Sequence, residues 1–173
     1  MIDNNIHTRV CAPEIIIRCA VPSDYGAVSR LEEIEFSAHR KARPDYFKDP
    51  KISYPEQEFS ELLGHPSPIA LVAEADSQIV GLCFGRIEAS RESTVCRSRL
   101  VAFIEDVVTL PKFRGRGIAG ALLSAAREKA EKSGADAVEL CVWDFNKDAL
   151  GLYKKLGFKV QYYRLEQSLS DLC

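Results

Sequence analysis

Residues 115–120, with the sequence GRGIAG, are the part of this chain best suited to bind a phosphate. Three glycines allow the backbone to approach a ligand closely. The helix expected directly after them presents unpaired N–H groups with a partial positive charge. Lys112, Arg114 and Arg116 add full positive charges beside the same loop. An anionic, phosphate-bearing ligand is therefore expected at this position.

The same letters satisfy the dinucleotide pattern G-x-G-x-x-G, but their surroundings argue against a nicotinamide cofactor. In that motif the first glycine directly follows an apolar strand, whereas here it follows LPKFR. An acidic residue about 20 positions further on should bind a ribose, yet Glu139 falls in mid-strand and Asp144 falls late. The loop is thus predicted to hold a pyrophosphate that belongs to another ligand.

The elements that must position this loop follow from the apolar patterns. A flexible arm is expected at residues 1–13, followed by one α/β domain over residues 14–173. Strands are predicted at 14–20, 68–75, 78–90, 99–110, 136–143 and 158–167, and helices at 22–36, 56–64, 117–134 and 146–157. Residues 37–55 are expected to form a loop or short helical turns. This order predicts a three-layer domain around a mixed sheet.

Composition limits the classes of partner. The 173 residues carry a net charge of −2, so no basic excess favours nucleic acid. No secretory leader and no apolar run of membrane-spanning length is found, and a cytoplasmic protein with no membrane partner is expected. None of the six cysteines forms a C-x-x-C pair, so no metal site is predicted.

Two motifs in this chain resemble the GNAT superfamily of N-acetyltransferases. The segment VVTLPKFRGRGIAGALL resembles its acetyl-coenzyme A loop, whose pattern R/Q-x-x-G-x-G/A is matched by Arg114, Gly117 and Ala119. The segment NKDALGLYKKLGF resembles the second signature, through Asn146, Ala149, Tyr153, Gly157 and Phe158. The resemblance implies the three-layer α/β/α fold of that family, with a mixed, mostly antiparallel sheet splayed between its fourth and fifth strands.

The resemblance also implies acetyl-CoA as cosubstrate, with no metal. The residues expected to bind it are Val107, Val108, Thr109, Arg114, Gly115, Arg116, Gly117, Ile118, Ala119, Gly120, Asn146 and Tyr153. Backbone groups of residues 107–109 would pair with the pantetheine amides like an added strand. Among them, the N–H of Val108 is the predicted donor to the oxyanion.

For the chemistry, the resemblance implies direct attack of a primary amine on the thioester. Tyr153 matches the family's tyrosine that protonates the departing thiolate. Glu105 is the predicted base, because strand alternation places its side chain on the same face as that of Val107. Asp106 would point the opposite way unless a bulge intervenes. A chain of waters is the third alternative for the base.

The amine acceptor is expected to meet residues from the region between the first strand and the hairpin. Glu35, His39, Asp106 and Trp143 are the predicted acceptor residues, and the acceptor is either a small molecule or a protein amine. The sequence leaves open the length of the acyl chain that is transferred and whether the protein forms a homodimer. It also leaves open a second class of function, a non-catalytic regulatory module that binds acyl-CoA.

Overall fold

The computed structural model describes residues 14–48, 54–90 and 94–169. The predicted arm at residues 1–13 lies outside these ranges. The chain divides into two compact units, the first ending at Cys141 and the second beginning at Val142. Within the described ranges, no helix combines the length and the apolar character that crossing a bilayer requires.

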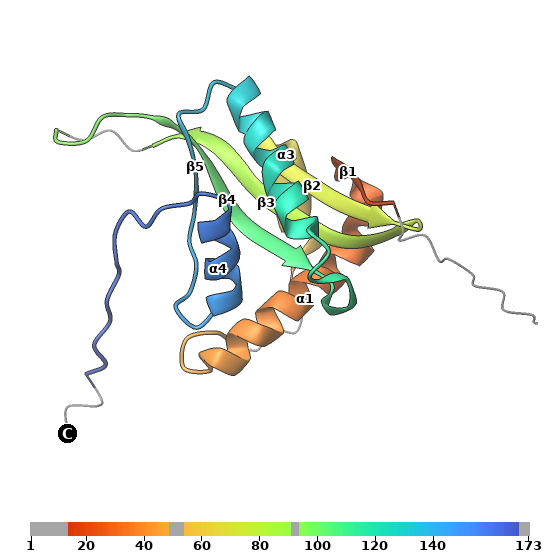
Figure 1. The fold of residues 1–173 in the computed structure, drawn as a ribbon, viewed down its shortest axis with the longest axis horizontal. Helices are drawn as coiled ribbons and strands as arrows, with labels where there is room; N and C mark the ends of the chain where they lie inside the picture. Colours follow the sequence, from red (N-terminus) through yellow and green to blue (C-terminus); the bar gives the residue numbers. More distant parts are fainter. Residues whose placement is uncertain (1–13, 49–53, 91–93, 170–173) are drawn as a thin grey trace, which may run out of the picture. The chain divides into compact units, whose positions relative to one another are not determined.

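A five-stranded sheet forms the centre of the first unit, with the strands in the order β1-β2-β3-β4-β5 (Figure 1). Its strands are β1 (Ile16–Cys19), β2 (Pro68–Ala75), β3 (Gln78–Ala89), β4 (Leu100–Thr109) and β5 (Ala137–Leu140). The first four strands are antiparallel to their neighbours, and β5 runs parallel to β4. The predicted mixed, mostly antiparallel sheet is thereby confirmed.

The hairpin between β2 and β3 turns at the two residues that the sequence pattern assigned to it. Asp76 and Ser77 both have positive φ, at 47° and 59°. Two-residue hairpin turns of this kind match the right-handed twist of the flanking strands. The turn therefore fixes the register of β3, the strand that pairs with β4.

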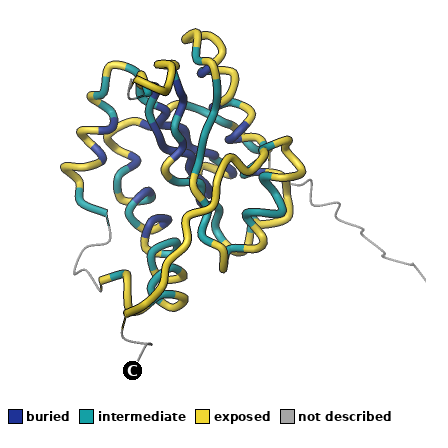
Figure 2. Tube along the Cα trace, turned by 90° about the vertical axis from the view of Figure 1, so that its left-hand side faces the viewer, coloured by how far each residue is buried: buried dark blue, intermediate teal, exposed yellow. Residues whose placement is uncertain are grey.

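Two helices cover one face of the sheet. They are α1 (Tyr25–Ala42), which follows a short 3₁₀ turn η1 (Pro22–Asp24), and α2 (Glu56–Gly64). Their buried side chains meet those of the middle strands in one apolar cluster, which contains Val28, Leu31, Phe59, Leu62, Ala70, Val72, Leu82, Phe84 and Val108. Figure 2 shows this buried interior in dark blue.

The other face is covered by α3 (Ile118–Lys132). Its side chains Ile118 and Leu122 lie so close to Gly81 of β3 that a Cβ there would come within 3.2–3.3 Å of them. Gly134 follows the helix with a φ of 75°, in the left-handed conformation that is common just after a helix C-terminus. Together, α1, α2, the sheet and α3 form three layers.

Helix α1 is longer than the pattern predicted. The segment after residue 36 was expected to be a loop or short helical turns, yet it continues the same helix to Ala42. The next two residues are Arg43 and Pro44, and a residue before proline is disfavoured in the helical region. Proline, rather than the preceding charged residues, thus ends this helix.

The second unit contains α4 (Lys147–Lys155). The strand predicted at residues 158–167 is not formed, because none of the described residues after α4 is in a strand. Its large side chains are exposed, with Tyr163 at 81% and Leu165 at 90%. A β-prone pattern needs a neighbouring strand to pack on, and this segment has none.

Candidate active site

The glycine loop joins a 3₁₀ turn, η2 (Pro111–Phe113), to the start of α3. Gly115 and Gly117 have φ values of 75° and 80°, in the left-handed region that favours glycine. A Cβ at either position would meet no atom within 4 Å, so the backbone conformation, not crowding, requires glycine. Gly117 is the N-cap of α3, which places the loop at the positive end of that helix's dipole.

Three cations stand beside this loop. The Arg114 guanidinium donates through Nε to the carbonyl oxygen of Thr109 at 3.2 Å. The ring of Phe113 lies 5.1 Å from the Arg116 guanidinium and 5.2 Å from the Lys112 ammonium. An anion on the α3 N-terminus would therefore meet both backbone N–H groups and full positive charge.

One edge of β4 is left uncovered in its second half. β5 pairs with β4 only from Val101 to Ile104, whereas β4 itself continues to Thr109. On the other edge, β3 accompanies β4 to Thr109. The edge of β4 beyond residue 104 that faces away from β3 thus has no strand partner in the described sheet, which is the splay that the fold prediction required.

The hydrogen-bond alternation of β4 decides which backbone groups face that edge. The Leu110 N–H donates to the Val80 carbonyl oxygen at 2.9 Å, and Val108 is opposite Leu82. Since groups two residues apart on a strand point the same way, the Val108 N–H also points toward β3. The backbone N–H groups of Val107 and Thr109 point the opposite way, toward the uncovered edge.

A bulge in β4 changes which side chains share a face. Gly85 of β3 is opposite Ile104, but Phe84 is opposite Asp106, so Glu105 is an extra residue in β4. The Glu105 carboxylate pairs with Arg86 at 2.9 Å, and Arg86 lies two residues from Phe84 on the α1 side of the sheet. Simple alternation therefore fails here, and Glu105 and Asp106 both lie on the face that α1 covers.

Three carboxylates converge at this point. One oxygen each from Glu32, Glu35 and Asp106 lies within 4.8 Å of the other two. Glu32 is almost fully buried at 1% exposure, and the other two are mostly buried. In the described chain, Glu32 Oε1 and Glu35 Oε2 have no hydrogen-bond partner. We call these three residues the acidic triad; among the described residues they are the group that could hold a cation.

Burial and mutual repulsion raise the pKa of every triad member. Loss of solvent contact is the main cause in each case, followed by repulsion from neighbouring carboxylates. The pKa of Glu35 rises to about 8, and those of Glu32 and Asp106 also lie above their ordinary values. The triad therefore cannot be fully ionised at neutral pH without a compensating cation.

The other two predicted acceptor residues, His39 and Trp143, are not members of the triad. His39 lies one turn beyond Glu35 on α1, with its ring 5.2 Å from that of Phe47 and Nδ1 3.0 Å from the Glu35 carbonyl oxygen. Trp143 stacks on Phe145 in the second unit, with ring centres 5.9 Å apart. Of the four predicted acceptor residues, Glu35 and Asp106 thus come together in the triad.

Two predicted residues lie on α4. The Asn146 side chain accepts a hydrogen bond from the Ala149 N–H at 3.2 Å, so it caps the N-terminus of this helix. The ring of Tyr153 lies 5.8 Å from that of Phe158, and the Phe158 N–H donates to the Tyr153 carbonyl oxygen. Their roles toward a cosubstrate stay predictions.

Sequence reasoning missed Glu32, although a signal was present. Val28, Leu31, Glu32 and Glu35 have the i, i+3, i+4, i+7 spacing of one helix face. The first two of these are buried in the core. Two glutamates that continue an apolar stripe indicate buried carboxylates, which need a partner or a function.

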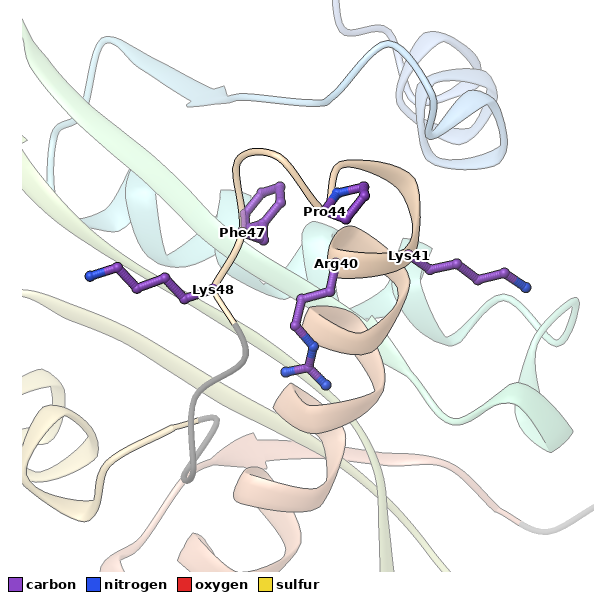
Figure 3. A pocket seen from close by; sticks show the side chains of 5 residues that line it. All are labelled: Arg40, Lys41, Pro44, Phe47 and Lys48. Carbon is purple, nitrogen blue, oxygen red and sulfur yellow. The ribbon is translucent and has the colours of Figure 1, made fainter.

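A cavity also opens at the C-terminal end of α1, lined by Arg40, Lys41, Pro44, Phe47 and Lys48. Figure 3 shows Lys41 and Lys48 extending away from it in opposite directions. The Arg40 guanidinium bonds to Glu33 at 3.0 Å. None of the site residues predicted from the sequence lines this cavity.

The sequence profile of the Acetyltransferase (GNAT) family matches residues 29–158. The chain belongs to this family. It is 35% identical over 127 residues to the "Uncharacterized N-acetyltransferase MJ1207" of Methanocaldococcus jannaschii, a match that covers 73% of this chain and 54% of that protein. The chain thus spans about half the length of this curated relative.

Solved structures agree with the family assignment. A mutant of the BH1408 protein from Bacillus halodurans superposes with a TM-score of 0.85 at 27% identity, covering 89% of this chain and 99% of that one. The aminoglycoside N-acetyltransferase AAC(6')-Iy, in complex with CoA, gives a TM-score of 0.68 at 21% identity over 91% and 99% of the two chains. The latter likeness concerns the fold alone.

Proposed function

We propose that this protein transfers an acetyl group from acetyl-CoA to a primary amine. One observation carries the proposal: the uncovered edge of β4, over residues 105–109, leads through the 3₁₀ turn η2 into a glycine loop at the N-terminus of α3. A pantetheine chain needs an edge of this kind for its amides, and a pyrophosphate needs such a loop. The family membership supports the same cosubstrate.

The cosubstrate is bound by backbone at both ends. The N–H groups of α3's first turn, with residues 114–120, hold the pyrophosphate. The pantetheine amides pair with backbone groups of Val107 and Thr109, as an added strand pairs with a sheet edge. The backbone alternation favours Val107 or Thr109 over Val108 as the oxyanion donor, because the Val108 N–H is directed toward Leu82.

The reaction requires three proton transfers and the exchange of a C–S bond for a C–N bond. The acceptor ammonium loses one proton to Glu105, directly or through a water, and the neutral amine attacks the thioester carbon. The C–N bond forms, the C–S bond breaks, and the nitrogen loses its second proton. The departing thiolate takes a proton from Tyr153, and the second proton from the nitrogen restores the Tyr153 hydroxyl through solvent. The products are the N-acetylamine, the coenzyme A thiol and the one proton that Glu105 releases to solvent.

Glu105 has a setting that suits a base. Its side chain is 34% exposed and can exchange a proton with solvent, while the Arg86 guanidinium holds it in place. It lies at the bulge, two residues before Val107. Bulges next to active sites often redirect one side chain in this way. Asp106 and a water chain are the alternative bases, and the role passes to one of them if the substitution of Glu105 has no effect.

Two measurements on the purified protein test the proposal. Calorimetry should detect binding of acetyl-CoA, and a panel of primary amines should release free thiol from it. Binding without thiol release for any amine would favour a non-catalytic acyl-CoA-binding module. An absence of binding would contradict both functions.

A further inference from the structure

The acidic triad raises the question of what neutralises it. Glu32, Glu35 and Asp106 form no ion pair with any described residue. The neighbouring Arg86 pairs with Glu105. The other groups whose charge acts on the triad are Glu58 and Glu105, which are also acidic. An ionised carboxylate as deeply buried as Glu32, which is 1% exposed, is costly unless a cation joins it.

The spacing of the triad fits an ammonium group. One oxygen of each carboxylate lies no more than 4.8 Å from the other two. For three such atoms there is a central point that lies within about 2.8 Å of each, which is 4.8 Å divided by the square root of three. Charge-assisted N–H···O bonds have lengths of about 2.7–2.9 Å. An alkylammonium has three N–H donors, so one nitrogen at this centre can donate one hydrogen bond to each carboxylate. The Oε1 atom of Glu32, without a partner otherwise, would gain one.

The triad is unsuited to the amine that reacts. That amine must lose a proton before it can attack, and three surrounding carboxylates stabilise its charged form. A group held here therefore stays an ammonium. It must be a second charge on the same acceptor molecule, close to the reacting amine, since Asp106 directly precedes Val107 in β4.

We propose that the acceptor is a diamine or polyamine, whose non-reacting ammonium is bound by Glu32, Glu35 and Asp106 while its other amine is acetylated. This inference rests on the proposed acetyltransferase function and deepens it. A divalent metal suits the triad less well. Mg²⁺ keeps several waters and Ca²⁺ takes six to eight oxygens, whereas the triad offers three carboxylates and Glu32 is almost fully shielded from solvent.

The inference is tested with two matched acceptors, 1,4-diaminobutane and n-butylamine, which differ in one ammonium. In the wild-type protein, kcat/KM should be more than tenfold higher for 1,4-diaminobutane than for n-butylamine. Glu35→Gln should lower the ratio at least tenfold, and Glu32→Gln should do the same if its melting curve shows a folded protein. Glu33→Gln is the matched control, because Glu33 lies on the same helix, is 53% exposed and should leave the ratio unchanged. A wild-type ratio near one would overturn the proposal.

A binding measurement separates this inference from the proposed function. With coenzyme A present, calorimetry should detect 1,4-diaminobutane binding to the wild-type protein and at least tenfold weaker binding to Glu35→Gln. This result would stand even if no amine released thiol, in which case only the catalytic proposal would fail. Tight binding of MgCl₂, CaCl₂ or MnCl₂ alone, abolished by Glu35→Gln and unaffected by the diamine, would overturn the inference in favour of a metal site.

Discussion

At the scale of single residues, the carboxylates along α1 and β4 differ in what surrounds them. Glu105 is partly exposed and paired with a guanidinium. Glu35, whose pKa is raised to about 8, is mostly buried beside Asp106. We propose the first as the base and the second as part of a site for a positive charge. These two settings lead to different experiments.

Glu35→Gln should stabilise the ligand-free protein at alkaline pH. The folded-state pKa of Glu35 lies near 8, above the ordinary glutamate pKa of 4.5. The stability from this group is thus fully present below pH 4.5 and is lost as the pH rises through 8. The variant should gain roughly 1–3 kcal/mol over wild type at pH 8.5 and much less at pH 5. Denaturant unfolding at both values measures this, with Glu33→Gln as the control. An equal difference at the two pH values would refute the buried-carboxylate account.

Glu105→Gln should remove the base while preserving the side chain's shape. An alkylammonium with a pKa near 10 is almost wholly protonated at pH 7, so the rate should fall by roughly 10²- to 10⁴-fold. Raising the pH should recover much of it, because solution then supplies neutral amine. A pH–rate profile from pH 6 to 10 measures the change. A higher KM alone would show that Glu105 binds the ammonium, and a profile equal to wild type would transfer the role to Asp106 or water.

Tyr153→Phe should slow turnover with little change in acetyl-CoA affinity. It keeps the ring that lies beside Phe158 and deletes the proton donor. The loss of kcat should be roughly 10- to 1000-fold. Tyr162→Phe is the matched control, since Tyr162 is 72% exposed and lies in the same unit. Unchanged turnover under conditions where chemistry limits the rate would mean that water protonates the thiolate.

At the scale of elements, the turn from β4 into α3 is the part of the proposed site that the sequence predicted best. Its glycines and cations are consecutive in the chain, so their chemistry follows from local order alone. Gly117→Asp should place bulk and negative charge at the N-cap of α3. The Kd for coenzyme A should rise at least tenfold, about 1.4 kcal/mol, in a protein that still folds.

Gly134→Asp provides the control for this change. Gly134 has a φ of 75°, close to the 80° of Gly117, and a Cβ at either position meets nothing within 4 Å. Both variants therefore carry similar backbone strain, but Gly134 follows the opposite end of α3. Calorimetry should find unaltered coenzyme A affinity for it. Equal losses in both variants would assign the effect to strain and remove the phosphate site from the loop.

Features that depend on packing between elements were harder to predict. The bulge at Glu105 arises from the pairing of β3 with β4, which a single strand's pattern does not contain. Glu32 lies on an apolar stripe, but only its packing beside Asp106 shows that it joins a cluster. The segment 158–167 has the pattern of a strand, yet a strand requires a partner. Nonlocal contacts thus account for most of the differences.

At the scale of the whole molecule, the net charge of −2 is the sum of many basic and acidic residues that lie in different parts of the chain. In the first unit, basic residues gather at the loop after β4, and acidic residues gather where β4 meets α1. The loop suits the anionic cosubstrate and the triad suits a cationic acceptor. Global stability should therefore respond to both ligands, each with its own dependence on pH.

Binding of 1,4-diaminobutane should raise the melting temperature more at pH 8.5 than at pH 5. A ligand that binds only the folded state stabilises it according to its concentration over its Kd. At pH 5 the triad, with its raised pKa values, is largely protonated and its protons compete with the ammonium. At pH 8.5 the carboxylates can ionise, while the diamine, whose amines have a pKa near 10, stays charged.

At a hundredfold excess of diamine over its Kd, the free energy of unfolding should rise by about 2.7 kcal/mol, which raises the melting temperature by roughly 5–11 °C for a chain of this length. Scanning fluorimetry with n-butylamine as the matched ligand measures it. A larger shift at pH 5, or equal shifts with both amines, would mean that the triad holds its own protons rather than an acceptor's charge.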